Sequence, residues 1–235
     1  MKRLMDVVLA PATVTAVHRG AGRFLAVTLT GPALAGLRVT PGQQVRIQVG
    51  SSNPLVDRIR GALRTYSVWE YDGTGLALRI LDHGEGPGAR WARTVRAGDP
   101  VGLLRPSGTF VCRPSTYSLF VGDETASVAF GAMIRGLGDG ARTQAVVETE
   151  TERDQLPLPG PVAWVHRRGR PAARSAELVA AVARLDLPPR PGTAYLAGEA
   201  ATIQLVRDHL VRERGWSRRD VVTKPFWAPG RTGME

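Results

Sequence analysis

The pattern of apolar and polar residues divides the chain into two parts. Residues 1–113 contain six short runs in which apolar and polar positions alternate or β-branched residues dominate, separated by turn sequences such as TPGQ, YDGTG and RAGDP. A period of two is typical of strands with one buried face, and six such runs at this spacing predict an antiparallel β-barrel. The runs are TVTAVHR, RFLAVTLTG, QQVRIQVG, RTYSVWEYDG, GLALRILDHG and DPVGLLRPSG.

Residues 117–235 follow a different pattern, in which apolar strand-like runs alternate with amphipathic helical segments. YSLFVGD, RTQAVVET, VAWVHR, TAYLAGE and DVVTKPFWA have strand character, while TASVAFGAMIRGL, SAELVAAVARL and ATIQLVRDHLVRER have helical character. This order predicts a mostly parallel sheet with crossover helices. Pro114 and small polar residues mark the boundary. We therefore expect two domains, a barrel over 1–113 and an α/β domain over 117–235.

The net charge of the chain bears on which classes of molecule the protein binds. The 235 residues carry a formal net charge of +10, but Lys2 and Lys224 are the only lysines and the arginines are scattered. Such a surface attracts anionic small molecules or acidic proteins at least as well as it attracts DNA. A nucleic-acid or structural binding module is the least favoured hypothesis, and we expect no nucleic-acid partner.

The sequence also predicts a cytoplasmic protein without a membrane partner. No window reaches the roughly 18 uninterrupted apolar residues of a membrane span, and the single Cys112 allows no internal disulfide. The N-terminal apolar run resembles a secretory signal, but Asp6 interrupts it and Pro11 breaks it. The four histidines lack metal-ligand spacing, so we expect no metal site.

A glycine-rich stretch, HGEGPGARWA at 83–92, follows one barrel strand and opens a short helical segment. The free N–H groups at a helix start attract anions, and glycines let a phosphate approach closely. The alternative is a plain loop that enters a helix. RTYS at 64–67 lies on another barrel run and places Arg64 and Tyr66 on one face of a strand. That pair suits a phosphate and a flat heterocycle, or else a surface cation beside a half-buried tyrosine.

A third stretch, VGDETASVAF at 121–130, lies where the first strand of the α/β part meets its first helix. Ligands of open parallel sheets bind at these carboxyl ends of strands. GLGDG at 136–140 imitates a dinucleotide fingerprint, but it follows a helix and is better interpreted as a cap and turn.

The three stretches, in this order, resemble those of the siderophore-interacting protein family of flavin-dependent ferric-siderophore reductases. The family's Arg-x-Tyr-Thr/Ser corresponds to RTYS, its His-Gly…Gly-Pro-Ala…Trp-Ala to HGEGPGARWA, and its Gly-Asp-Glu-Thr-Ala to GDETA. Weaker matches follow in VVETE, VAWVHRRG, YLAGEAATI and PFWAPG, so the resemblance covers nearly the whole chain.

The resemblance implies a ferredoxin-reductase-like fold in which FAD binds the barrel and NAD(P)H docks on the second domain. The flavin carries the chemistry, so no catalytic acid or base is expected of the protein. The implied FAD-binding residues are Arg64, Tyr66, Ser67, His83, Pro87, Gly88, Ala89, Trp91, Thr125 and Ala126. The implied nicotinamide-nucleotide residues are Asp123 and Glu124, with Glu148 at the adenosine ribose.

The expected substrate is a ferric siderophore or another anionic small molecule, with Arg46, Lys224 and Trp227 as binding candidates. Four residues depart from the family pattern: Arg79, Gly88, Arg105 and Ala228. Gly88 replaces a common alanine, and Ala228 replaces an arginine. The alternative function is therefore the same flavin-binding scaffold turned to another small molecule, as a flavin or quinone reductase or in a non-redox biosynthetic role. The sequence leaves NADPH, NADH and ferredoxin open as electron donors, because Glu148 would repel a 2′-phosphate that Arg167 and Arg168 could attract.

Overall fold

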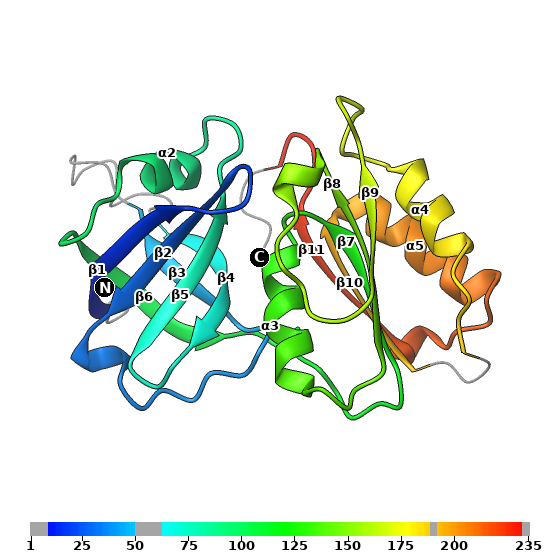
Figure 1. Ribbon diagram of the computed structural model, residues 1–235, viewed down its shortest axis with the longest axis horizontal. Coiled ribbons are helices and arrows are strands. Elements are labelled where there is room, and N and C mark those ends of the chain that lie inside the picture. The colour runs from blue at the N-terminus through cyan, green and yellow to red at the C-terminus, as the bar shows by residue number, and fades with distance from the viewer. Residues whose placement is uncertain (1–8, 50–62, 189–191, 232–235) are drawn as a thin grey trace, which may run out of the picture. The chain divides into compact units, whose positions relative to one another are not determined.

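The computed structural model describes residues 9–49, 63–188 and 192–231 (Figure 1). The chain divides into two compact units, the barrel unit (1–109) and the sheet unit (110–235). The barrel unit is a closed barrel with strand order β1-β2-β5-β4-β3-β6, and the sheet unit contains a five-stranded sheet in the order β11-β10-β7-β8-β9. The predicted fold class, a β-barrel followed by a parallel α/β unit, is confirmed.

The barrel strands coincide with the alternating runs of the sequence, and every described pairing between them is antiparallel. The barrel unit comprises β1 (Ala10–Arg19), β2 (Phe24–Thr30), a 3₁₀ turn (Pro32–Leu34), β3 (Gln44–Gln48), β4 (Leu63–Tyr71), β5 (Gly75–Leu81), α2 (Pro87–Thr94) and β6 (Pro100–Ser107).

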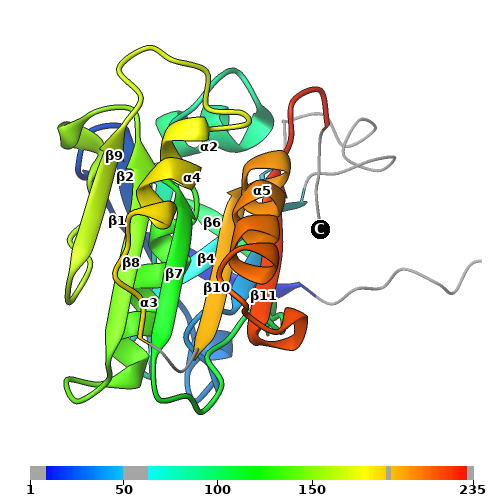
Figure 2. The ribbon, with the colours of Figure 1, turned by 90° about the vertical axis from the view of Figure 1, so that its right-hand side faces the viewer.

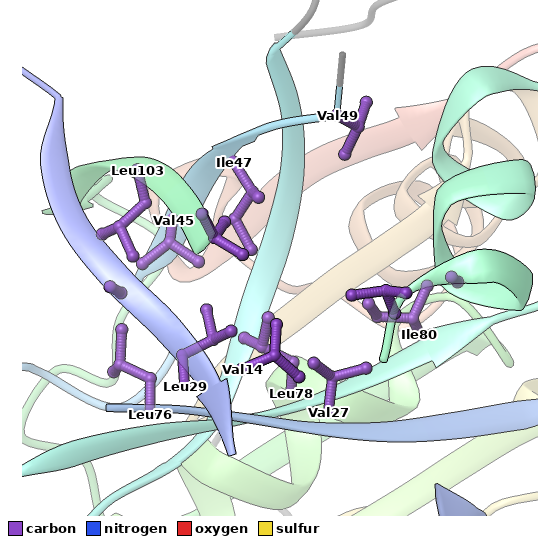
Figure 3. Packing of buried hydrophobic residues seen from close by; sticks show 14 of the residues in the cluster. Val14, Val27, Leu29, Val45, Ile47, Val49, Leu76, Leu78, Ile80 and Leu103 are labelled. Carbon is purple, nitrogen blue, oxygen red and sulfur yellow. The ribbon is translucent and has the colours of Figure 1, made fainter. Parts of the chain in front are cut away.

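Inward-facing aliphatic side chains from these strands form the barrel core (Figure 3). They come from alternate positions, as the period of two requires. Ala92 of α2 and Val95 just after it join the same core, so α2 packs onto the barrel (Figure 1). The labelled residues are Val14, Val27, Leu29, Val45, Ile47, Val49, Leu76, Leu78, Ile80 and Leu103.

The sheet unit has parallel pairings throughout its five strands. Its elements are β7 (Ser118–Asp123), α3 (Ser127–Leu137), β8 (Thr143–Thr149), a 3₁₀ turn (Glu152–Asp154), β9 (Val162–His166), α4 (Ala176–Ala183), β10 (Thr193–Glu199), α5 (Ala200–Arg212), a 3₁₀ turn (Arg218–Asp220) and β11 (Val221–Trp227).

Helices cover both faces of this sheet (Figures 1 and 2). One core cluster joins the sheet to α4 and α5, and another joins it to α3. After β7 the chain continues to β8, which pairs with one side of β7, and it later returns to β10, which pairs with the other side of β7. This reversal of strand order next to β7 is where open parallel sheets bind ligands.

Gly122, near the end of β7, allows the closest backbone approach at this edge. A Cβ there would collide with the carbonyl oxygen of Ala197 on β10 and lie 2.9 Å from Cβ of Ala126. The absence of a side chain thus permits both the pairing of β7 with β10 and the tight turn into α3.

We expect Gly122→Ala to lower the free energy of unfolding by about 3 kcal/mol, because the added methyl group must displace backbone. Gly140→Ala is the matched control, since a Cβ at that exposed turn position has no atom within 4 Å. It should change stability by less than about 1 kcal/mol. Urea denaturation followed by circular dichroism measures both, and equal stability of the two variants would contradict the account.

Candidate functional site

Residues from β4 and α2 converge in the barrel unit. Tyr66 and Arg64 pair with Val45 and Ile47 of β3, which lie in the barrel core, so all four side chains share the inward face of their strands. The Tyr66 ring lies 5.9 Å from the Trp91 ring of α2, measured between centroids. The strand that carries RTYS and the helix that follows the glycine-rich stretch, predicted from separate motifs, therefore meet at Tyr66.

Gly88 lies directly against the Tyr66 hydroxyl. A Cβ at Gly88 would be 2.7 Å from Oη of Tyr66 and 3.5 Å from Cγ of Arg64. The first distance would force the Tyr66 hydroxyl to move, whereas the second is an ordinary van der Waals contact. The structure thus brings Arg64, Tyr66, Gly88 and Trp91 together.

The Tyr66 hydroxyl is buried and has no hydrogen-bond partner among the described residues. Its burial raises the pKa of Tyr66 well above the ordinary value, although the charge of Arg64 opposes this. The group therefore stays protonated at neutral pH. A buried donor without a partner costs free energy unless a bound molecule supplies an acceptor.

The backbone amides at the start of α2 also lack a side-chain acceptor. Gly86 is the N-cap and makes no side-chain cap, Pro87 has no N–H, and the first turn contains no acidic residue. The amides of Gly88 and Ala89 thus lack the intrahelical partners that later amides have. Together with Arg64, whose stem passes Gly88, this start forms a cradle suited to a phosphate.

Other predicted residues of the barrel unit lie apart from this convergence. Ser67 pairs with Gln44 and is 8% exposed, on the face of β4 opposite to Tyr66. Arg46 pairs with Thr65 and occupies that same opposite face. His83 is exposed in the loop before α2. Arg79, which departs from the family pattern, lies over the Trp69 ring at 5.4 Å.

In the sheet unit, Asp123 connects three strands at their carboxyl ends. Its carboxylate accepts hydrogen bonds from the amides of Thr125 (2.9 Å) and Glu199 (2.8 Å) and from Nε1 of Trp227 (2.8 Å). Asp123 is 4% exposed. Burial, reinforced by the neighbouring Glu124, raises the pKa of Asp123 to about 6.

Glu124 and Glu148, the other two predicted nucleotide residues, are bound to Arg167 after β9. Both Nη atoms of Arg167 donate to Glu124, and Nη1 also lies 3.4 Å from Oε2 of Glu148. The Ser175 hydroxyl donates to the other oxygen of Glu148. Arg167 is 4% exposed. Burial alone would lower its pKa, but the hydrogen bonds and charges of Glu124 and Glu148 raise it above the ordinary value. Arg167 is therefore enclosed by carboxylates, whereas Arg168 is exposed and pairs with Glu152 at 2.7 Å.

The remaining predicted residues of the sheet unit lie nearby or on β11. Ala126 is buried as the N-cap of α3, and its amide donates to the Asp123 carbonyl at 2.9 Å. Lys224 lies between Val222 and Phe226, and these alternate residues share the face that packs toward α3. Trp227 is held through its indole by Asp123.

The sequence analysis missed Ser175, and it missed Glu199, the N-cap of α5, which accepts from Ala201 and Thr202. The sequence did contain a signal for Glu199, because an acidic residue lies at the end of that strand-like run, as at Asp123 and Glu148. Within the described residues, no group of three His, Cys, Asp or Glu side chains is arranged to hold a metal ion. In the same part of the chain, no helix has the length and apolar character needed to cross a membrane.

Comparisons with known proteins agree with the sequence motifs. The family model described as "Siderophore-interacting FAD-binding domain" matches residues 51–110, and the model described as "Siderophore-interacting protein" matches residues 115–230. An uncharacterised Mycobacterium tuberculosis protein is 30% identical over 190 residues, which span 74% of this chain and 67% of that protein.

Ferric vibriobactin reductase ViuB from Vibrio cholerae is 27% identical over 180 residues, which span 72% of this chain and 65% of ViuB. The crystal structure of a siderophore utilization protein from T. fusca superposes with a TM-score of 0.82 at 26% identity and covers 96% of this chain and 95% of that one. The resemblance predicted from the motifs is confirmed. The chain belongs to the siderophore-interacting protein family.

Proposed function

We propose that the protein is an FAD-dependent oxidoreductase that reduces Fe(III) held by a siderophore, with NAD(P)H as the source of electrons. Family membership and the similarity to a ferric vibriobactin reductase support this proposal. The observation that carries it is the buried, unpartnered Tyr66 hydroxyl beside the uncapped start of α2. A cytoplasmic location is part of the proposal, and the single cysteine is consistent with it.

The residues around α2 fit the two chemically different parts of FAD. The guanidinium of Arg64 and the amides of Gly88 and Ala89 supply positive charge and donors for a diphosphate. The protonated Tyr66 hydroxyl supplies a donor for an oxygen or nitrogen of the cofactor, and Trp91 supports the Tyr66 ring. Bound FAD would accept an electron pair from a reduced nicotinamide and release single electrons to two Fe(III) ions in turn.

In the sheet unit, we propose that Asp123 positions the nucleotide-binding edge through its contacts with Thr125, Glu199 and Trp227. Glu124 and Glu148 are held by Arg167, so they shape the charge of that edge. Arg167 is enclosed by these carboxylates, which leaves the exposed Arg168 as the better candidate of the two for a 2′-phosphate. Ferredoxin is the alternative electron donor.

The alternative function uses the same flavin site for a different small molecule. Ala228 favours it, because the family's arginine would supply a cation beside an anionic substrate. Lys224 and Arg231 are then the cations on either side of Ala228 in the terminal segment, and Lys224 has no acidic partner among the described residues. The substrate test below separates the two functions.

Removing only the Tyr66 hydroxyl should separate cofactor binding from folding. In Tyr66→Phe, we expect the apo-protein to melt at the same temperature or higher, because a buried donor without a partner is lost. The dissociation constant for FAD should rise at least about fivefold, because the cofactor loses that donor. Scanning calorimetry of the apo-protein and titration with FAD measure the two effects. Unchanged FAD affinity with a less stable apo-protein would show that the hydroxyl is structural.

A double-mutant cycle tests the contact between Gly88 and Tyr66. Gly88→Ala should weaken FAD binding in the wild-type background, because the new Cβ displaces the Tyr66 hydroxyl 2.7 Å away. In the Tyr66→Phe background the nearest ring atom is Cζ at 3.7 Å, an ordinary contact, so the same substitution should cost less. A coupling free energy of about 1 kcal/mol is expected for FAD binding. Additive effects would contradict the proposed geometry.

The reductase activity is tested anaerobically with ferric chelates. FAD-loaded protein is reduced, and we expect an anionic ferric siderophore to reoxidise it. Lys224→Glu should weaken chelate binding at least about tenfold at low salt, because a positive charge that attracts the anionic chelate is replaced by a negative charge that repels it. Arg46→Glu should weaken chelate binding by a similar factor, because Arg46 is the second cation proposed to bind the chelate.

The control for charge is Arg142→Glu, an exposed arginine just before β8, at the amino ends of the parallel strands. It should leave chelate binding within about twofold of wild type. If no ferric chelate reoxidises protein that retains FAD, the siderophore reductase proposal fails and the alternative function replaces it.

A further inference from the structure

The barrel unit contains a second candidate site, a cavity of about 450 Å³ between the β1–β2 hairpin and α2. Four arginines contribute to its lining: Arg19 and Arg23 from the hairpin, and Arg93 and Arg96 from α2 and the residues just after it. Asp82, at the end of β5, is the carboxylate among the described lining residues. Arginines therefore outnumber carboxylates among the described lining residues.

This cavity lies on a different side of α2 from the candidate flavin site. Trp91 faces Tyr66 on β4, whereas Arg93, two residues later, lies about 200° further around the helix. None of the residues proposed to bind FAD lines the cavity. A ligand here would not compete directly with the cofactor.

The arginines are held in place by contacts within the barrel unit. Nε of Arg93 pairs with Asp82 at 2.8 Å and Nη1 with Glu85 at 3.3 Å. Nη1 of Arg96 donates to the carbonyl oxygens of Arg93 (3.1 Å) and Val95 (2.9 Å) at the end of α2. Arg93 is thus largely neutralised by its neighbours, whereas Arg96 has no acidic partner among the described residues.

The hairpin fixes the opposite wall. Its turn is closed by the amide of Gly20 donating to the Phe24 carbonyl (2.8 Å) and by the amide of Phe24 donating to the Ala21 carbonyl (2.9 Å). Arg19 precedes this turn and, within the described chain, has no acidic partner. Arg19 and Arg96 therefore line the cavity from two elements without an acidic partner in the part of the chain that the structure describes.

The size and floor of the cavity indicate the class of ligand. A volume of about 450 Å³ falls in the range of pockets for small organic molecules and greatly exceeds that of a single inorganic phosphate. Val17, Leu25 and Ala92 contribute apolar surface to the lining. Arginine forks match the oxyanions of phosphate and carboxylate groups.

We propose that this cavity binds a small organic molecule carrying at least two negative charges as phosphate or carboxylate groups. Arg19 and Arg96 bind the charged groups from opposite walls, and Arg93 shapes the site through Asp82. The apolar lining contacts the body of the molecule. The site is independent of the proposed reductase function, because it uses no residue assigned to flavin, nicotinamide or chelate.

The test is calorimetric titration of the FAD-loaded full-length protein at low ionic strength. The probes are fructose 1,6-bisphosphate for phosphate esters, citrate for polycarboxylates and inorganic pyrophosphate for charge without an organic body. We expect fructose 1,6-bisphosphate or citrate to bind more tightly than pyrophosphate. Arg19→Glu and Arg96→Glu should each weaken that binding at least about tenfold, and added salt should weaken it in wild type.

Arg38→Glu is the matched control, because Arg38 is an exposed arginine of the barrel unit outside the cavity. It should change affinity by less than about twofold, and the flavin absorbance of all three variants should equal that of wild type. The proposal is overturned if neither organic anion binds or if pyrophosphate binds as tightly as they do. It is also overturned if Arg38→Glu weakens binding as much as the cavity variants, or if a poly-glutamate peptide binds more tightly than the small anions.

Discussion

The close approach of α2 to β4 at Gly88 is the constraint on which the barrel's candidate site depends. Because Gly88 has no side chain, the Tyr66 hydroxyl reaches the first turn of the helix, 2.7 Å from the place that a Cβ would occupy. This close approach thereby brings a protonated hydroxyl, an arginine and the amides of the first helical turn into one place. Each group alone is common in proteins, but together they fit a phosphate joined to a polar, aromatic cofactor.

The sheet unit obeys a different constraint, the burial of carboxylates at the carboxyl ends of its strands. Asp123 satisfies donors from β10 and β11, and Glu124 and Glu148 share Arg167. Buried charges are tolerated only when they are paired and hydrogen-bonded. These contacts hold the turns that follow β7 and β8 in fixed positions, so the edge that would meet a nucleotide is already ordered by the protein's own interactions.

Local sequence patterns predicted the strands of the barrel and the glycine-rich segment. Contacts between residues far apart in the sequence could not be predicted in this way. Alternation placed the barrel strands, and it also separates Ser67 from Tyr66, because adjacent strand residues point to opposite faces. The glycine-rich motif indicated a place where a phosphate can approach closely, but the proximity of Gly88 to Tyr66 appears only in three dimensions. Likewise, no periodicity reveals that Glu124 pairs with Arg167, 43 positions away. The basic cavity escaped prediction because its arginines come from separate elements, and the sequence showed only that they are scattered.

The central claim is that the start of α2 and Arg64 hold the diphosphate of FAD, and comparison of FAD with riboflavin tests it most directly. Riboflavin has the same isoalloxazine ring and ribityl chain but no phosphate. Apo-protein titrated with each at low ionic strength should bind FAD at least about a hundredfold more tightly, and salt should narrow the difference as it screens the charges. Equal affinity for the two molecules, with no effect of salt, would contradict the account.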